Sequence, residues 1–360
     1  MTHSYRVAVV GATGYVGQRF VTLLDSHPWF HVDRLFASPR SAGKSYRDAV
    51  DGRWRLTTPV PSASAALMVE SSEAIEDKLD GIDLVFCAVD MPKDAVRELE
   101  ERMARTETVV VSNNSAHRAT PDVPMVVPEI NHEHLALIPA QRRRLGTSHG
   151  FIAVKPNCSI QSYVPALSPL LDFGIEQLFV STYQAISGAG KTFADWPEMV
   201  ENLIPYIGGE EEKSEVEPLR IWGRFAGDHI VPATKPLISA QCYRVAVQEG
   251  HTASVSVSFR EKPGRGEILE RWAACAGRPQ QLELPSAPRQ FLHYFDEDNR
   301  PQPRLDADLE GGMAVSIGRL REDPILDWKF TCLSHNTLRG AAGGAVLTAE
   351  LLAAEGYLAR

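Results

Sequence analysis

Cys158 stands in a setting that suits a nucleophile. It follows Pro156 and Asn157 in the segment PNCS, and the apolar stretch from residue 160 to about residue 171 predicts a helix directly after it. A helix dipole stabilises a thiolate at the helix N-terminus, and the thiolate is the reactive form of cysteine. The remaining cysteines lie in apolar runs and are expected to be small buried hydrophobic residues: Cys87, Cys242, Cys275 and Cys332.

Arg244 and His251 lie close together in the sequence, next to two predicted strands. Arg244 is expected on the strand face opposite Tyr243 and Val245, and His251 follows a Glu-Gly turn. An arginine that emerges from a sheet can hold a carboxylate through two hydrogen bonds. A neighbouring histidine can move a proton. The chain has 11 histidines, so from spacing alone a surface or capping role for His251 stays open.

The segment GATGYVG, residues 11–17, is a candidate phosphate-binding turn. It follows the apolar run Tyr5–Val10 and precedes an amphipathic stretch from residue 18 to about residue 26, which predicts strand, turn and helix. Glycines let a phosphate approach the backbone there, and the helix N-terminus favours the anion. The spacing is GxxGxxG rather than GxGxxG, so an ordinary tight turn is the alternative. The predicted cofactor-binding residues are Gly11, Ala12, Thr13, Gly14, Tyr15 and Val16.

The end of the second predicted strand, residues 32–37, should select the nucleotide. An NAD enzyme usually has Asp or Glu there, which binds the ribose 2′-hydroxyl. This strand instead runs into SPRSAGK, which contains no acid. Arginine and lysine pair with a 2′-phosphate, so the sequence favours NADP, the alternative being a solvated loop. The predicted contacts are Ser38, Arg40, Ser41 and Lys44.

Two further segments allow two interpretations each. Ser187, Gly188, Ala189 and Gly190 follow a predicted strand and could approach a flat cofactor ring or form a simple turn. The charge run at residues 210–213 is, on its residues alone, typical of a solvated helix face.

Composition sets limits on the function. The 360 residues carry a net charge of −9, which argues against a nucleic-acid-binding protein because such proteins usually have a basic face. Five widely spaced cysteines without a CxxC pair fit neither a disulfide framework nor a zinc site, and indicate a reducing cytoplasm and no metal. The N-terminus lacks a signal-peptide pattern, and the apolar stretch at residues 340–352 is too short for a membrane span.

The pattern of elements predicts an α/β fold with two domains. Apolar strands at residues 5–10, 32–37, 82–89 and 108–112 alternate with helical stretches, as in a Rossmann-like parallel sheet. After about residue 150, alternating strands at 177–185, 243–247 and 252–259 indicate an α+β domain with a mixed sheet. Residues 279–304 are expected to be a long surface excursion, and residues 336–357 a helix.

The chain resembles the aspartate-β-semialdehyde dehydrogenases over nearly its full length, particularly the archaeal and fungal branch. Eight ordered blocks carry the resemblance: GATGYVG, ASPRSAGKSY, SNNSAHR with DVPMVVPEIN, PNCS, TYQAISGAG, GGEEEK, CYRVAVQEGH and NTLRGAAGGA. The resemblance implies an NADP-binding domain at residues 1–150, completed by residues 335–360, and a catalytic and dimerisation domain at residues 151–334. It also implies a homodimer or homotetramer.

The resemblance also implies a role for each site residue. Cys158 would form a thioacyl-enzyme, His251 would be the general acid/base, and Gln184 would position the reacting carbonyl. Arg244 would bind the substrate carboxylate and Glu210 the amino group. Arg118, Asn157 and Lys213 would form the phosphate pocket, and Asn336 would join Ser187–Gly190 at the cofactor.

The implied reaction is the reversible, NADP-dependent conversion of β-aspartyl phosphate to aspartate semialdehyde and phosphate, in lysine, threonine, methionine and isoleucine biosynthesis. One position departs from the family pattern NPNC, because Lys155 replaces its first asparagine. Lys155 would add positive charge near the thiolate or point to solvent.

Three alternatives stay open. A malonyl-CoA reductase would share the thioester chemistry but would have no substrate amino group for Glu210. An N-acetyl-glutamyl-phosphate reductase would have a motif closer to NPGCY, which Asn157 and Ser159 disfavour. A non-catalytic NADP-binding regulator would not need Cys158 and His251.

Overall fold

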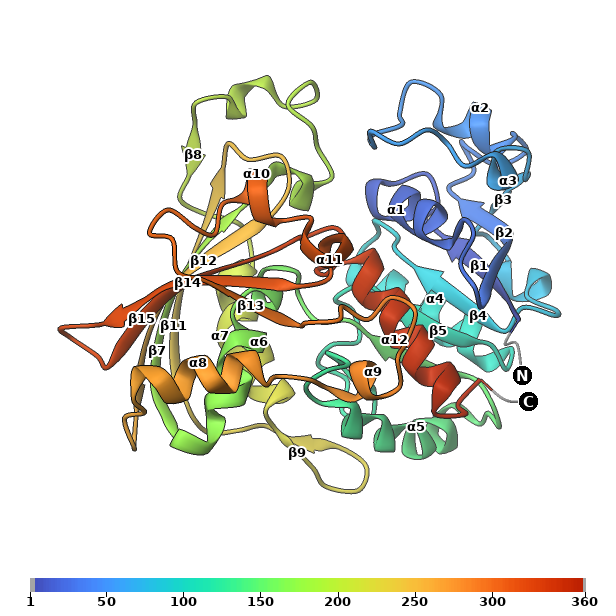
Figure 1. Cartoon of the computed structure of the whole chain (residues 1–360). Helices are drawn as coiled ribbons and strands as arrows, with labels where there is room; N and C mark the ends of the chain where they lie inside the picture. Colours follow the sequence, from blue (N-terminus) through green and yellow to red (C-terminus); the bar gives the residue numbers. More distant parts are fainter. Residues whose placement is uncertain (1–3, 359–360) are drawn as a thin grey trace.

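The computed structural model of the chain describes residues 4–358 and has two lobes (Figure 1). The first lobe is built on a six-stranded parallel sheet with the strand order β3-β2-β1-β4-β5-β6. Its central strands are buried on both faces, as is usual for parallel sheets covered by helices. The strands are β1 Tyr5–Val10, β2 Phe30–Ala37, β3 Val69–Ser71, β4 Leu84–Cys87, β5 Val109–Ser112 and β6 Phe151–Val154.

Helices cover both faces of this sheet. Helix α1 packs with the face that carries Val7 and Val9, and α4 packs with the face that carries Ala8 and Val10. The helices of the lobe are α1 Tyr15–Leu24, α2 Tyr46–Val50, α3 Ser62–Ala65, α4 Lys93–Arg105 and α5 Ile138–Leu145, with short 3-10 helices η1 Ile75–Lys78 and η2 His132–Leu137.

The last helix of the chain, α12 (Ala342–Ala354), returns to the first lobe and packs beside α1 and β5 (Figure 1). Nearly every residue of α12 is buried, which explains why its sequence is apolar on all sides. The predicted helix at 336–357 therefore begins later than expected, because residues 336–341 form a turn. No helix within residues 4–358 is both long and apolar enough to cross a membrane.

The second lobe is built on a seven-stranded mixed sheet with the order β13-β14-β15-β12-β7-β11-β8. The pairs β7/β11 and β13/β14 are parallel, and the others are antiparallel. The strands are β7 Ile175–Gln184, β8 Leu203–Ile204, β11 Leu237–Val245, β12 His251–Phe259, β13 Leu292–Phe295, β14 Val315–Glu322 and β15 Trp328–Ser334, and a separate ribbon consists of β9 Arg224–Phe225 and β10 Ile230–Val231.

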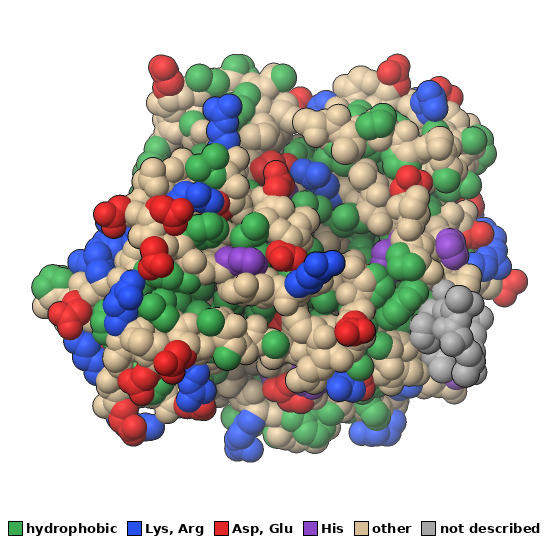
Figure 2. Space-filling view, in the orientation of Figure 1, with side chains coloured by type: hydrophobic (Ala, Val, Ile, Leu, Met, Phe, Trp, Pro, Cys, Tyr) green, Lys and Arg blue, Asp and Glu red, His purple; other side chains and the backbone are tan. Residues whose placement is uncertain are grey.

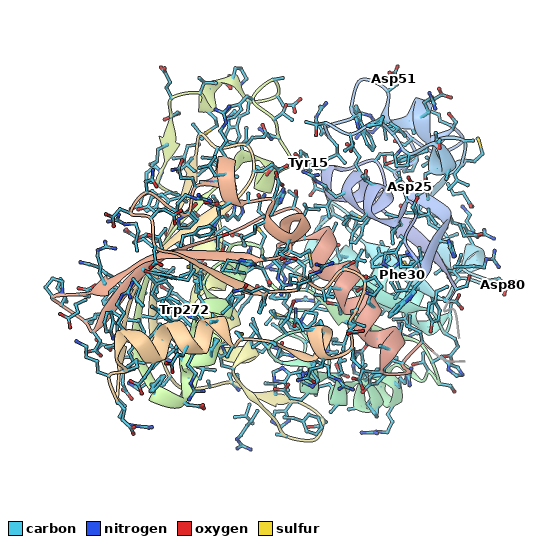
Figure 3. All side chains as sticks on the ribbon, viewed as in Figure 1. Tyr15, Asp25, Phe30, Asp51, Asp80 and Trp272 are labelled. Atoms are coloured by element: carbon cyan, nitrogen blue, oxygen red, sulfur yellow. The ribbon has the colours of Figure 1, made fainter. Side chains whose placement is uncertain are left out.

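Helices pack on one face of this second sheet. Trp272 of α8, labelled in Figure 3, stacks on Tyr294 and meets the ring of Phe330 edge-on. The helices of the lobe are α6 Val164–Leu167, α7 Glu210–Ile221, α8 Arg265–Ala273, α10 Pro303–Asp306 and α11 Leu309–Gly312, with 3-10 helices η3 Ser159–Gln161, η4 Ser168–Phe173, η5 Ile186–Ala189 and η6 Pro197–Met199. Helix α9 Arg278–Gln281 lies instead beside α12 of the first lobe, where Arg278 pairs with Glu355 (Figure 1).

The two faces of the second sheet differ sharply in exposure. On β7 and β11, the inner face carries buried residues such as Gln184 and Arg244, while the outer face carries Phe179, Tyr183 and Leu237 in exposed positions. Tyr183 stacks on Tyr243 across the two strands at 5.7 Å between ring centroids. The same strands therefore position side chains inside the lobe and present an apolar surface outside it.

The predicted fold class, a Rossmann-like domain followed by a domain with a mixed sheet, is confirmed. Two local predictions are wrong. The helix expected from residue 160 to 171 is broken into η3, α6 and η4, and Pro165 and Pro169 stand at starts of the later pieces. Residues 279–304 are not a surface excursion throughout, because β13 joins the sheet and Phe291 and Leu292 are fully buried.

Candidate active site

Cys158 and His251 meet at the boundary of the two lobes. Cys158 follows β6 of the first sheet, and His251 begins β12 of the second. The Cys158 Sγ atom lies 3.5 Å from His251 Nε2. The thiol predicted as a nucleophile and the histidine predicted as its partner are thus in contact, although 93 residues separate them.

The hydrogen bonding of His251 assigns different roles to its two ring nitrogens. Nδ1 accepts a hydrogen bond from the Ala185 amide at 3.0 Å. A neutral ring therefore carries its proton on Nε2, the atom that faces Cys158. Complete burial lowers the pKa of His251 well below its ordinary value, and the Arg244 guanidinium lowers it further. The ring is consequently neutral near pH 7 and presents an N–H donor to the sulfur.

The pKa of the Cys158 thiol is raised, which corrects the expectation of a thiolate stabilised by a helix. Burial is the largest cause, and the Glu210 carboxylate adds to it. The helix after Cys158 is only the three-residue η3, so the dipole it offers is small. Lys155, Arg118 and Arg244 act in the opposite direction and favour the thiolate.

Glu210, at the start of α7, is the centre of a buried hydrogen-bond network. Its carboxylate accepts bonds from Asn157 Nδ2 at 3.0 Å, Gln184 Nε2 at 3.2 Å and Lys213 Nζ at 2.8 Å. Burial alone would raise the pKa of Glu210, but Lys213 and these hydrogen bonds outweigh it and the pKa is lowered. The carboxylate is therefore ionised and can attract an ammonium group.

Arg244 lies on the inner face of β11, as its alternation with Tyr243 predicts. Its Nη1 donates to the Ala185 carbonyl at 2.6 Å. A Cβ atom at Gly188 would lie 2.8 Å from Nη1 and 3.0 Å from Cε1 of His251, so only glycine allows the loop to approach both side chains. Ser187 and Gly188 thus line the site, whereas Ala189 and Gly190 are exposed and do not reach the cavity.

Arg118 is held in place by three partners. Its guanidinium donates to the carbonyls of Lys155 and Asn113 and forms an ion pair with Glu217 at 3.0 Å. The second carboxylate oxygen of Glu217 accepts the Asn157 amide at 2.6 Å. Glu217 therefore fixes both the predicted phosphate ligand and the backbone next to Cys158.

Part of the predicted site forms one cavity of about 240 Å³. It brings residues of both lobes together: Val16, Arg118, Asn157, Cys158, Ser187, Gly188, Lys213 and Asn336, along with Lys155, Asn113 and Ser115. Gln184, Glu210, Arg244 and His251 border the same centre through the hydrogen bonds described above. Asn336 donates to the Ser187 hydroxyl at 2.8 Å and so ties the turn before α12 to the 187–190 loop.

A larger cavity of about 980 Å³ lies in the cleft between the lobes, whose opening is visible at the top of Figure 2. It is lined by residues such as Tyr15, Arg19 and Glu249 and contains no thiol. Tyr15, labelled in Figure 3, donates to Glu249 at 2.6 Å, and Arg19 pairs with the same carboxylate. Glu249 thereby links α1 of the first lobe to the strand that carries His251.

The glycine turn fits a dinucleotide. Gly11 has φ +85°, and a Cβ atom there would lie 2.2 Å from the Ala88 carbonyl oxygen. Gly14 is the N-cap of α1, and no side chain of the described residues caps the helix, which leaves the first amides for a phosphate. Gly11, Ala12, Thr13, Gly14 and Tyr15 lead to Val16 at the cavity edge, so a cofactor bound along the turn can reach Cys158.

The tip of β2 lies away from this cavity and is suited to the far end of a dinucleotide. Ser38, Arg40 and Lys44 are exposed, and within residues 4–358 neither cation forms an ion pair. Ser41 is fully buried, and its hydroxyl accepts a bond from Arg53 at 3.2 Å. Ser38, Arg40 and Lys44 are therefore the side chains that a 2′-phosphate can meet directly.

Sequence reasoning missed Asn113, Glu217 and Glu249. Glu217 lies seven residues after Glu210 and four after Lys213, so helical spacing could have placed all three on one face of α7. Asn113 has buried side-chain atoms without a hydrogen-bond partner among the described residues, which is typical of a group that meets a ligand. No cluster of three or more metal-ligating side chains occurs in residues 4–358.

Two family models match this chain. The model described as "Semialdehyde dehydrogenase, NAD binding domain" matches residues 6–138, and that described as "Semialdehyde dehydrogenase, dimerisation domain" matches residues 167–339. Together they span both lobes.

Individual proteins are also similar over nearly the whole chain. The aspartate-semialdehyde dehydrogenase of Methanothermobacter thermautotrophicus is 42% identical over 96% of this chain and 98% of its own. That of Aspergillus fumigatus is 41% identical over 98% of each. The crystal structure of the Candida albicans enzyme with NADP has a TM-score of 0.88 and 38% identity, and the match covers 98% of this chain and 99% of that one. The resemblance to archaeal and fungal relatives is confirmed.

Proposed function

The chain belongs to the aspartate-semialdehyde dehydrogenase family, and we propose that it works through a thioacyl-enzyme on Cys158. It is an NADP-dependent oxidoreductase that converts β-aspartyl phosphate to aspartate β-semialdehyde and phosphate, reversibly, in the biosynthesis of lysine, threonine, methionine and isoleucine. The observation that carries the mechanism is the contact of Cys158 Sγ with His251 Nε2 at the edge of a cavity lined by cationic side chains.

The charged groups around the cavity match the charges of the substrate. Arg244 takes the α-carboxylate, because its guanidinium is buried on the inner sheet face beside His251. Glu210 takes the α-amino group, since it is ionised and buried. Arg118 and Lys213 hold the phosphate, with Asn157 beside them.

In the first half-reaction, the Cys158 thiolate attacks the acyl carbon of β-aspartyl phosphate. A carbon–sulfur bond forms, the bond between the acyl carbon and the phosphate oxygen breaks, and phosphate leaves toward Arg118 and Lys213. Gln184, anchored on Glu210, positions the reacting carbonyl. The Nε2–H group of His251 stabilises negative charge on the sulfur and then on the acyl oxygen.

NADPH, when bound, supplies the hydride that reduces the thioester carbon. The glycine turn at 11–16 would hold its pyrophosphate, and the loop at 187–190 with Asn336 would hold its nicotinamide end on the side of Cys158. Gly188 permits this close approach because it has no side chain. The carbon–sulfur bond then breaks, the Cys158 thiolate leaves, and the aldehyde is released.

The assignment of reaction and substrate is tested by following the absorbance of the nicotinamide when the protein is mixed with NADP, phosphate and aspartate semialdehyde. Phosphate-dependent NADPH formation is expected. Oxidation of NADPH by malonyl-CoA, without activity on aspartate semialdehyde, would overturn the assignment of substrate.

Arg40→Ala should weaken NADP binding on the order of tenfold to a hundredfold while changing NAD binding little. The reason is the loss of a charge-assisted contact to the 2′-phosphate, which NAD lacks. The measurement is KM for each nucleotide. Arg105→Ala, which removes a surface arginine of α4 paired with Glu101, is the matched control. An unchanged ratio of NADP to NAD preference would refute the assignment of the β2 tip.

The outer face of the second sheet is the proposed dimer interface. Its exposed aromatic and aliphatic side chains lie in the span matched by the dimerisation model, and Phe179 is 52% exposed. Such an apolar patch on a sheet without a covering layer marks a protein contact. A homotetramer would need a second interface in addition.

Tyr183→Asp should convert the dimer to a monomer, because it would bury an unpaired charge at the centre of this face. The measurement is molar mass by light scattering during size-exclusion chromatography. Ile325→Asp, at a position 86% exposed between β14 and β15, is the control and should leave the mass unchanged. A dimeric Tyr183→Asp protein would place the interface elsewhere.

A cytoplasmic location is part of the proposal. All five cysteines are free, including Cys158, whose role requires a reduced thiol. A reducing compartment maintains that state.

A further inference from the structure

Lys155 is a buried lysine without an acidic partner. It follows β6 and is 3% exposed. Its Nζ atom donates a hydrogen bond to the Pro156 carbonyl, and within residues 4–358 it forms no ion pair. Fully buried lysines are rare unless they are paired, so this position calls for a specific partner.

The carboxylates near Lys155 are already engaged. Glu217 pairs with Arg118 and accepts the Asn157 amide. Glu210 pairs with Lys213. Glu129 forms a buried pair with Arg339, a further cation that faces Lys155. Among residues 4–358, Lys155 is therefore a basic side chain of this region that pairs with no protein carboxylate, a property it shares with Arg244.

Lys155 shares a cavity with Cys158. Both side chains line the 240 Å³ site, with Arg118 beside them. The pKa of Lys155 is lowered to about 7: burial is the largest cause and the Arg118 guanidinium adds to it, whereas negative charge on Cys158 acts in the opposite direction. A thiolate at Cys158 would thus favour the protonated, ammonium form of Lys155.

We infer that Lys155 is the counter-ion of the Cys158 thiolate and receives the proton that the thiol releases. This inference rests on the proposed role of Cys158 as nucleophile. The proton leaves Sγ, passes through the cavity that both groups line, and ends on the neutral amine Nζ. The neutral pair of thiol and amine becomes a pair of thiolate and ammonium, so the net charge of the buried site does not change.

The other groups around the sulfur are less suited to take this proton. His251 already carries a proton on Nε2, because Nδ1 accepts the Ala185 amide. Arg118 and Arg244 are permanently charged and have no lone pair to offer. Glu210 is ionised and opposes a thiolate, which increases the need for a cation.

The test is the pH dependence of Cys158 alkylation by iodoacetamide, located by mass spectrometry, in the wild type and Lys155→Met. Methionine keeps the length and apolar stem of lysine, so packing is retained. The apparent pKa of Cys158 should rise by about one unit, and alkylation near neutral pH should slow roughly tenfold. Lys78→Met is the control, because Lys78 lies on η1 outside the cavity, where it pairs with Glu70. Its alkylation profile should stay close to that of the wild type.

Lys155→Gln provides a second variant if the methionine protein does not fold, and thermal melting checks both. The pH profile of kcat/KM should shift with the alkylation profile in either variant. An unchanged alkylation profile in Lys155→Met or Lys155→Gln would overturn the inference. A rise in KM for phosphate without any change in that profile would overturn it as well. Activity retained in Cys158→Ser would instead refute the proposed nucleophile, so the two failures can be told apart.

Discussion

Cys158→Ser should reduce phosphate-dependent NADPH formation to below about a thousandth of the wild-type rate. Serine keeps the size and position of the side chain but is a much weaker nucleophile, because its hydroxyl does not ionise near neutral pH. No other cysteine can replace it, since Cys87, Cys242 and Cys332 are buried in strands of the two sheets. The measurement is the initial rate with saturating NADP, phosphate and aspartate semialdehyde.

Two controls make this result specific. Cys275→Ser should keep nearly full activity, because Cys275 is half-buried beyond the end of α8 and burial raises the pKa of its thiol to about 11. NADP should bind to Cys158→Ser with nearly its wild-type affinity, since the glycine turn and β2 tip are untouched. Substantial activity in Cys158→Ser would eliminate the thioacyl route.

Local pattern predicted the elements that depend on near neighbours. The run Tyr5–Val10 followed by glycines gave the correct strand and turn, because a buried parallel strand needs continuous apolar residues and the turn at Gly11 needs a positive φ. The alternation around Arg244 also placed that side chain correctly on the strand face opposite Tyr243 and Val245. The strand, the turn and the strand face of Arg244 can each be predicted from a few consecutive residues.

The parts that depend on distant contacts were not accessible from local pattern. The carboxylate of Glu210 is ionised and buried only because Asn157, Gln184 and Lys213 converge on it, and two of these lie on other elements. On its residues alone the charge run at 210–213 is typical of a solvated helix face, and only the family resemblance implies a role for it. The burial of residues 291 and 292 likewise depends on β13 pairing with β14, which the proline-rich sequence around it obscured.

The thiol pKa shows the same limit. The expected stabilisation by a helix dipole presumed a continuous helix after Cys158, but prolines divide that stretch into short pieces. Burial at the boundary of two lobes then dominates and raises the pKa. Activation of the sulfur must therefore come from side chains that the fold assembles, and His251 is the one in direct contact.

His251→Gln should lower kcat by about a hundred- to ten-thousand-fold, with a much smaller change in KM for aspartate semialdehyde. The binding groups Arg244 and Glu210 remain, but the Nε2–H donor that faces Sγ at 3.5 Å is lost or misplaced. Loss of the donor removes stabilisation of the sulfur and of the acyl oxygen in the transition state. Steady-state kinetics separates the two parameters.

The pH dependence follows from the lowered pKa of His251. A histidine whose pKa lies well below its ordinary value stays neutral as pH falls through 6.5, so its protonation should not produce a loss of activity near that pH.

His134→Gln is the control for His251→Gln, because His134 is equally buried but bonds to Asn131 and the Gly223 carbonyl outside the site. That variant should keep kcat within about threefold even if its melting temperature falls. A kcat of His251→Gln within tenfold of the wild type would show that the donor at Nε2 is dispensable, and the stabilising role would then pass to backbone amides around Cys158.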